Sequence, residues 1–166
     1  MKNKVPKKTK PSLPSIRAFM ENYAQRGVFR SFSSQPAPKG VAAFRMIWHR
    51  DRPFDLIVDT QKKTILIPEV LPGVPAAIYK DFKAFVESRH ADSLPDHRRI
   101  DKSKAHVRTT SRRGTVSLRM AVKGGEYEYG LQRLIHLVHE TYLIFLANGM
   151  YRDYMSEQLS ASFDIG

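Results

Sequence analysis

Hydrophobic residues recur every three or four positions in three segments of the chain, and this spacing predicts three helices. The first helix follows Ser15 as its N-cap and ends at Gly27, and the second follows Pro75 and runs to about Arg89. The third begins near residue 126 and extends, with one interruption, to residue 159. Its apolar stripe, which we expect to face the core, consists of Leu131, Leu134, Ile135, Val138, Tyr142, Phe145 and Leu146.

Elsewhere the hydrophobic period changes to two, which predicts strands over residues 42–48, 54–59 and 64–70. The connections between these strands are short and polar, as in hairpins. Pro68 has no N–H to donate, so we expect the third strand to end there or to lie at a sheet edge. Two further strands, 105–110 and 116–122, flank a turn that contains Gly114. Val28 to Phe32 lies in a loop-rich region or adds an edge strand.

The order of these elements is helix, three strands, helix, two strands, helix. Short connections between strands favour antiparallel pairing. We therefore predict an α+β fold, a two-layer sandwich in which helices pack on a largely antiparallel, twisted sheet. Residues 15–166 form one domain in this interpretation, and residues 1–14, with five lysines and three prolines, form a disordered basic tail.

The composition narrows the classes of function. The 166 residues include no cysteine, which excludes disulfides, thiolate nucleophiles and cysteine-bound zinc. The chain has neither an apolar run of the roughly 20 residues that a spanning helix needs nor a secretory signal at its start. We therefore expect a cytoplasmic protein without a membrane span.

The net charge of +12 is unevenly distributed. Residues 1–50 hold 11 basic residues against 1 acidic residue, and residues 95–123 hold 9 against 2. Residues 124–166 hold 2 against 6. Two basic blocks of this kind indicate an anionic partner or a dipolar molecule. If both blocks meet on one face, nucleic acid is favoured; if they are separated, protein binding is favoured.

The second basic block supplies candidate contacts for an anionic partner. Its residues could follow a phosphate backbone, although no Phe, Tyr or Trp occurs between Phe85 and Tyr127 to stack on unpaired bases. The alternative is a solvated, charged sheet edge that resists aggregation. The candidate contacts are Arg98, Arg99, Arg108, Arg112, Arg113, Arg119 and Lys123.

One stretch of the last helix has the residue types of a metal hydrolase. His136, His139 and Glu140 form H-x-x-H-E, whereas zinc helices have H-E-x-x-H or H-x-x-E-H. The helical phase places His136 and Glu140 on the solvent side, as an ordinary i, i+4 pair, with His139 at the margin of the core stripe. We therefore predict no catalytic residue, metal or cofactor, and keep a metal hydrolase as the alternative.

A second group of candidate residues lies on the predicted strands. Asp55 and Asp59 point outward from one strand, with His49 on the neighbouring one. Carboxylates in this arrangement can act in catalysis or bind a metal, but outward strand charges are usually solvated. We interpret them as solvated.

The order of elements and residues 127–159, YEYGLQRLIHLVHETYLIFLANGMYRDYMSEQL, resemble the YbjN-type, type III secretion chaperone-like proteins of bacteria. The resemblance extends from about Ser15 to Leu159 and concerns the architecture. It implies a non-enzymatic protein that binds other polypeptides and can form a homodimer, without a cofactor. Secretion chaperones are usually acidic, whereas this chain is basic, which favours a more general adaptor role. The alternative function is nucleic-acid binding through the tail and residues 98–123.

Overall fold

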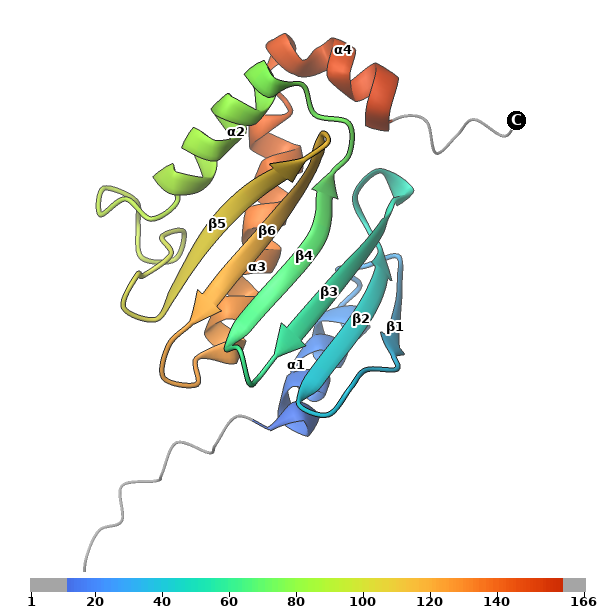
Figure 1. Cartoon of the computed structure of the whole chain (residues 1–166), viewed down its shortest axis with the longest axis vertical. Coiled ribbons are helices and arrows are strands. Elements are labelled where there is room, and N and C mark those ends of the chain that lie inside the picture. The colour runs from blue at the N-terminus through green and yellow to red at the C-terminus, as the bar shows by residue number, and fades with distance from the viewer. Residues whose placement is uncertain (1–11, 160–166) are drawn as a thin grey trace, which may run out of the picture.

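A computed structural model describes residues 12–159, which form four α-helices, short 3-10 and π-helical turns, and six strands (Figure 1). The elements are α1 (Leu13–Gln25), β1 (Ser31–Gln35), β2 (Val41–Ile47), β3 (Pro53–Asp59), β4 (Thr64–Leu71), α2 (Ala76–Ser88), β5 (Ala105–Arg112), β6 (Thr115–Val122), α3 (Tyr127–Glu140) and α4 (Arg152–Tyr154). Two π-helical segments, η2 (Thr141–Phe145) and η4 (Met155–Leu159), extend α3 and α4. Within residues 12–159, none of the helices is long and apolar enough to cross a membrane.

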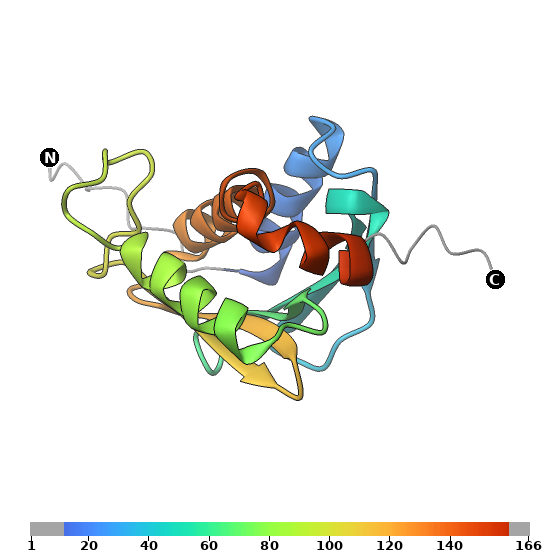
Figure 2. The ribbon, with the colours of Figure 1, turned by 90° about the horizontal axis from the view of Figure 1, so that it is seen from above.

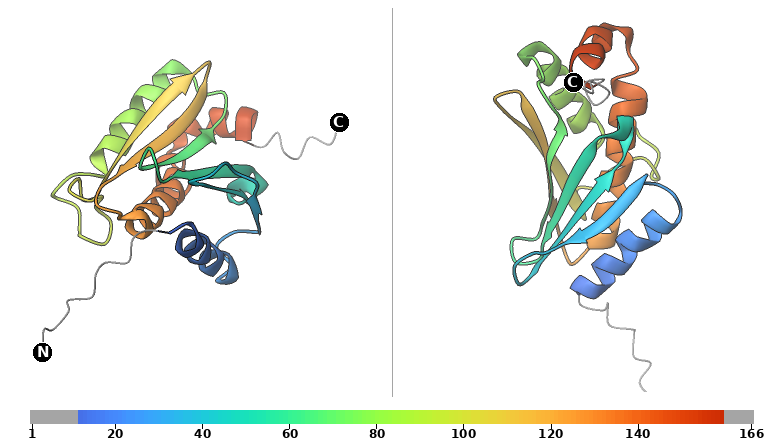
Figure 3. Two further views of the ribbon diagram at one scale, coloured as in Figure 1. Left: turned by 60° about the horizontal axis from the view of Figure 1, so that its bottom comes forward. Right: turned by 90° about the vertical axis from the view of Figure 1, so that its right-hand side faces the viewer.

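The predicted α+β sandwich is confirmed. The six strands form one antiparallel sheet in the order β1-β2-β3-β4-β6-β5. Helices α1 and α3 lie against one face of the sheet, and α2 lies along its β5 edge (Figures 2 and 3). The additional edge strand is present, but it occupies Ser31–Gln35 and not Val28–Phe32.

The core lies between the sheet and the helices because, along most of β2 to β6, buried residues alternate with half-buried or exposed ones. Val58, Ile65 and Met120 are fully buried, and cross-strand register brings them side by side. Every residue of the apolar stripe predicted for the last helix is buried, which confirms that stripe. At Gly130 a Cβ atom would lie 3.0 Å from Met120 Sδ and 3.1 Å from Ile65 Cδ1. Glycine therefore permits the close approach of α3 to the sheet.

The start of α1 differs from the prediction. The N-cap is Ser12 and not Ser15: the Ser12 hydroxyl accepts a hydrogen bond from the Ser15 N–H at 3.2 Å. The Ser15 hydroxyl in turn accepts a hydrogen bond from the Ser12 backbone N–H at 3.4 Å, which completes a capping box. The helix therefore begins at Leu13, inside the segment predicted as tail, and residues 1–11 of that tail lie outside the described residues.

The expectation for Pro68 was wrong. Strand β4 continues to Leu71 and lies in the middle of the sheet, between β3 and β6. The pairing of β4 with β6 shifts register between Ile67 and Leu71. Such an irregularity interrupts the ladder and leaves a residue unpaired, so a proline without an N–H is accommodated there.

The β5 edge of the sheet is covered by side chains from α2 and the residues that follow it. The Tyr79 hydroxyl donates to the Thr109 carbonyl at 3.1 Å, and the Val107 N–H donates to His90 Nε2 at 3.1 Å. Both backbone groups belong to the outer side of β5. These bonds satisfy polar groups that would otherwise be available to another strand.

Candidate functional site: the open face of the sheet

The face of the sheet opposite the helices has no helix on it within residues 12–159, and it faces the viewer in Figure 1. Cross-strand register places five side chains in one row over β2, β3, β4, β6 and β5. The row is Ala43, Ile57, Leu66, Arg119 and Arg108. The first three are apolar and half-buried, whereas both arginines are exposed. This open face therefore has an apolar centre and a basic end.

The basic end of the open face consists of unneutralised side chains. Arg108 and Arg119 are direct cross-strand partners, and Arg112 and Lys123 lie further along the same hairpin. Arg113 occupies the turn with a φ of 53°. Within residues 12–159, none of these five side chains has a hydrogen bond or an ion pair. They are available to an anionic partner.

Two of the predicted contacts, Arg98 and Arg99, differ from the others because they have partners within the protein. Arg98 Nη2 lies 3.4 Å from Glu140 Oε2, and Arg99 Nη2 lies 3.0 Å from Asp96 Oδ1. Both arginines belong to the connection between α2 and β5, not to the sheet face. These ion pairs partly neutralise the two arginines and stabilise this connection.

Arg30 and Arg45, two basic residues of the first block, lie near the opposite edge of the sheet. Arg45 on β2 binds Asp55 on β3 through two hydrogen bonds of 2.8 and 3.2 Å, and Arg30 pairs with Asp51. Half-buried apolar residues of β3 and β4 separate these pairs from the β5–β6 hairpin. Arg30 and Arg45 therefore do not form one surface with the basic residues of the hairpin.

Asp55 and Asp59 do not form a paired-carboxylate site. Asp55 is bound by Arg45, and Asp59 Oδ1 accepts hydrogen bonds from the backbone N–H groups of Gln61 and Lys62 at 3.0 Å. Asp59 thus stabilises the β3–β4 turn. His49, predicted beside these aspartates, packs against α3 instead. Both carboxylates have structural roles.

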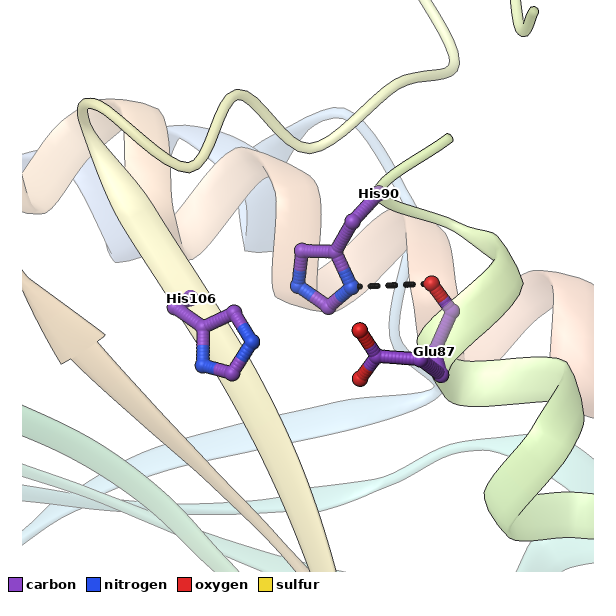
Figure 4. Close-up of side chains that lie close together, drawn as sticks. All are labelled: Glu87, His90 and His106. Carbon is purple, nitrogen blue, oxygen red and sulfur yellow. Dashed lines mark hydrogen bonds between the residues drawn. The ribbon is translucent and has the colours of Figure 1, made fainter. Parts of the chain in front are cut away.

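Three side chains at the end of α2 have the composition of a metal site. The nearest ligand atoms of Glu87, His90 and His106 all lie within 4.8 Å of one another, and Figure 4 shows the three side chains converging. However, His90 Nε2 accepts from the Val107 N–H, which requires the proton on Nδ1, and Nδ1 lies 3.2 Å from the Glu87 carbonyl. Because both ring nitrogens are engaged, a metal at His90 would first have to displace either the Val107 N–H from Nε2 or the Glu87 carbonyl from Nδ1.

The H-x-x-H-E residues do not converge as a zinc helix requires. Glu140 was predicted to be solvent-exposed and is instead buried, with 5% of its side chain exposed. Its Oε2 lies 2.6 Å from Arg89 Nη1, and its Oε1 lies 3.4 Å from His136 Nε2, so the predicted i, i+4 pair is present. Arg89, at the end of α2, and Arg98, in the connection that follows it, cover this side of α3, and both pair with the Glu140 carboxylate.

His139 turns away from His136 and Glu140 and joins an aromatic cluster that sequence reasoning missed. Its ring lies 4.8 Å from the ring of His49, which stacks on Tyr142 at 4.8 Å, and Trp48 lies 5.0 Å from His139. His49 Nε2, His139 Nδ1 and Trp48 Nε1 are buried without a hydrogen-bond partner in the described residues. Burial, with a smaller contribution from the charge of His139, lowers the pKa of His49 to about 4.

A hollow of about 280 Å³ lies beside this cluster. It is lined by Arg50, Leu146, Ala147, Asn148, Gly149, Arg152, Met155 and Ser156. The lining contains neither a histidine nor a carboxylate, so it does not supply the general base or metal ligands of a hydrolase.

No family model matches this chain, and the comparisons with curated proteins and with solved structures also found no match. The open face, with its apolar centre and its unneutralised arginines, is the candidate functional site.

Proposed function

We propose that this protein is a non-enzymatic module that binds another polypeptide on the open face of its sheet. The proposal is supported mainly by one row of side chains on this face. In that row the half-buried Ile57 and Leu66 lie next to two exposed arginines, Arg119 and Arg108. Apolar residues in the centre and charged groups at the rim are typical of a protein–protein interface.

The separation of the described basic residues favours a polypeptide over nucleic acid. Arg30 and Arg45 are neutralised near one edge of the sheet, whereas within residues 12–159 Arg108 and Arg119 of the β5–β6 hairpin have no ion pair and lie beside the apolar centre. Within the described strands, no open-face position is occupied by Phe, Tyr or Trp, which would stack on bases. A phosphate backbone has no apolar groups that would pack on the apolar centre, whereas apolar side chains of a polypeptide can bury it.

The resemblance to the YbjN-type, type III secretion chaperone-like proteins supports the same proposal. It implies a non-enzymatic bacterial protein of this architecture that binds other polypeptides and can bind a second copy of itself. The basic charge of the present chain favours an adaptor with its own partner over a chaperone for secreted effectors.

Nucleic-acid binding is the second candidate because Arg108, Arg112, Arg113, Arg119 and Lys123 have no partner within residues 12–159. It predicts an affinity that falls steeply with salt, since each neutralised phosphate releases a counterion. Binding of a duplex or single-stranded oligonucleotide that does not depend on Leu66 would favour this candidate.

The proposed function is tested by comparing two leucine variants of the full chain. Leu66→Asp places a carboxylate in the centre of the open face, and Leu143→Asp makes the same change at a side chain that is 65% exposed on η2. We expect the native chain and Leu143→Asp to capture the same polypeptide in a pull-down, and Leu66→Asp to lose it. Circular dichroism checks that both variants are folded. If Leu143→Asp no longer captured the polypeptide while Leu66→Asp still did, the proposed surface would be refuted.

A further inference from the structure

The Arg108–Arg119 pair is unfavourable for the isolated protein. The two residues face each other across β5 and β6, and like charges directly opposite each other destabilise a sheet. Their neighbours on the face are Leu66 and the hydroxyls of Thr110 and Ser117, which bond to each other at 2.6 Å. None of these neighbours compensates the charge.

Carboxylates on the open face and at the β5 edge are engaged by other groups. On the open face Asp55 is bound by Arg45, and at the β5 edge Glu87 lies 3.4 Å from Lys102 Nζ. Within residues 12–159 the arginine pair therefore has no anion of its own. An anion from outside would remove the repulsion between the two guanidinium groups and form short, paired hydrogen bonds with them.

The positive groups also form a line along the hairpin. Arg112 and Arg108 are four residues apart on β5, and Lys123, which directly follows β6, is four residues from Arg119. Each interval corresponds to about 13 Å along an extended strand. Beside this line runs the apolar centre, with Leu66 directly next to Arg119. The surface thus offers cationic and apolar contacts side by side over the length of the hairpin.

We infer that the open face selects an acidic polypeptide segment, whose carboxylates bind Arg108 and Arg119 while its apolar side chains cover Leu66 and Ile57. This inference rests on the proposed function and specifies the chemistry of the partner. The guanidinium fork fits a carboxylate with two hydrogen bonds, and the adjoining apolar centre distinguishes an acidic polypeptide from a polyanion without apolar groups.

The test uses a synthetic peptide of glutamate and leucine residues as the probe, with fluorescence anisotropy as the measurement. We expect the full chain to bind this peptide and not to bind the matched peptide in which glutamine replaces each glutamate. The double variant Arg108→Ala/Arg119→Ala should bind about ten-fold more weakly. Its control, Arg17→Ala/Lys80→Ala, removes the same charge from exposed positions on α1 and α2 and should bind like the native chain.

Two results would overturn the inference: equal affinity of the Arg108→Ala/Arg119→Ala variant for the acidic peptide, or tighter binding of heparin or an oligonucleotide than of the peptide at the same salt concentration. Failure of the inference is distinguishable from failure of the proposed function. If Leu66→Asp abolishes capture of a polypeptide partner while the arginine variant retains it, the open face still binds polypeptide, but not through acidic groups.

Discussion

Acidification should destabilise the fold through His49, and the structure sets the size of the effect. The ring of His49 lies in the aromatic cluster between the β2–β3 turn and the end of α3, stacked on Tyr142 with an interplanar angle of 4°. Its Nε2 atom is buried and has no hydrogen-bond partner in the described residues. Protonation there adds a charge that nothing neutralises, which is why the pKa is lowered from 6.5 to about 4.

The sign of the effect follows from proton binding. Between about pH 6.5 and pH 4 the unfolded chain binds more protons at His49 than the native protein does, so the free energy of unfolding falls as the pH falls. The stabilisation is fully present above pH 6.5 and is lost as the pH approaches 4. A shift of this size corresponds to about 2 kcal/mol at pH 5, and solvent at the half-buried ring reduces it to roughly 1–2 kcal/mol.

Urea denaturation of the native chain and of His49→Gln, each at pH 7.5 and pH 5, measures this contribution. The native chain should lose roughly 1–2 kcal/mol more than His49→Gln over this pH range. His97→Gln, at an exposed position, is the matched control and should behave like the native chain. Equal losses for the native chain and His49→Gln would refute the reasoning, whatever the stability of the variant at pH 7.5.

Three substitutions test other contacts. His90→Phe leaves the Val107 N–H without its acceptor, so hydrogen exchange should show faster exchange of that amide, and urea denaturation a loss of about 1–2 kcal/mol. Glu140→Gln removes the carboxylate beside Arg89 and should cost about 2–3 kcal/mol in the same assay; an unchanged stability would contradict the buried ion pair. Gly130→Ala should lower the melting temperature, at a cost of about 1–2 kcal/mol, despite the better helix propensity of alanine, whereas a stabilised variant would show that α3 can move away from the sheet.

The sequence predicted those parts of the fold that depend on local periodicity. Alternation along β5 and β6 identified the inward and outward residues of the hairpin, and the stripe on α3 identified the core side chains. The expectation for Pro68 was wrong because a shift in strand register is not visible in hydrophobic spacing. Glu140 was misplaced because Arg89 and Arg98, about 50 and 40 positions earlier, cover its side of the helix.

The candidate site was also predictable only in part, because it depends on strand register and on contacts between segments that are far apart in the sequence. The outward direction of Arg108 and Arg119 follows from the two-residue period, but their position in one row with Leu66 depends on the pairing of β4 with β6. The internal partners of Arg98 and Arg99 come from side-chain geometry in an irregular connection. The contact of His49 with His139 joins segments 90 residues apart, and no spacing in the sequence indicates it.

Methyl NMR of the full chain, titrated with the polypeptide that it captures, shows whether the open face of the sheet is the binding surface. We expect the methyl signals of Ile57 and Leu66 to shift in proportion to binding, while those of the exposed Leu143 and Ile144 on η2 do not change. Shifts confined to Leu143 and Ile144, with Ile57 and Leu66 unchanged, would contradict binding at the open face.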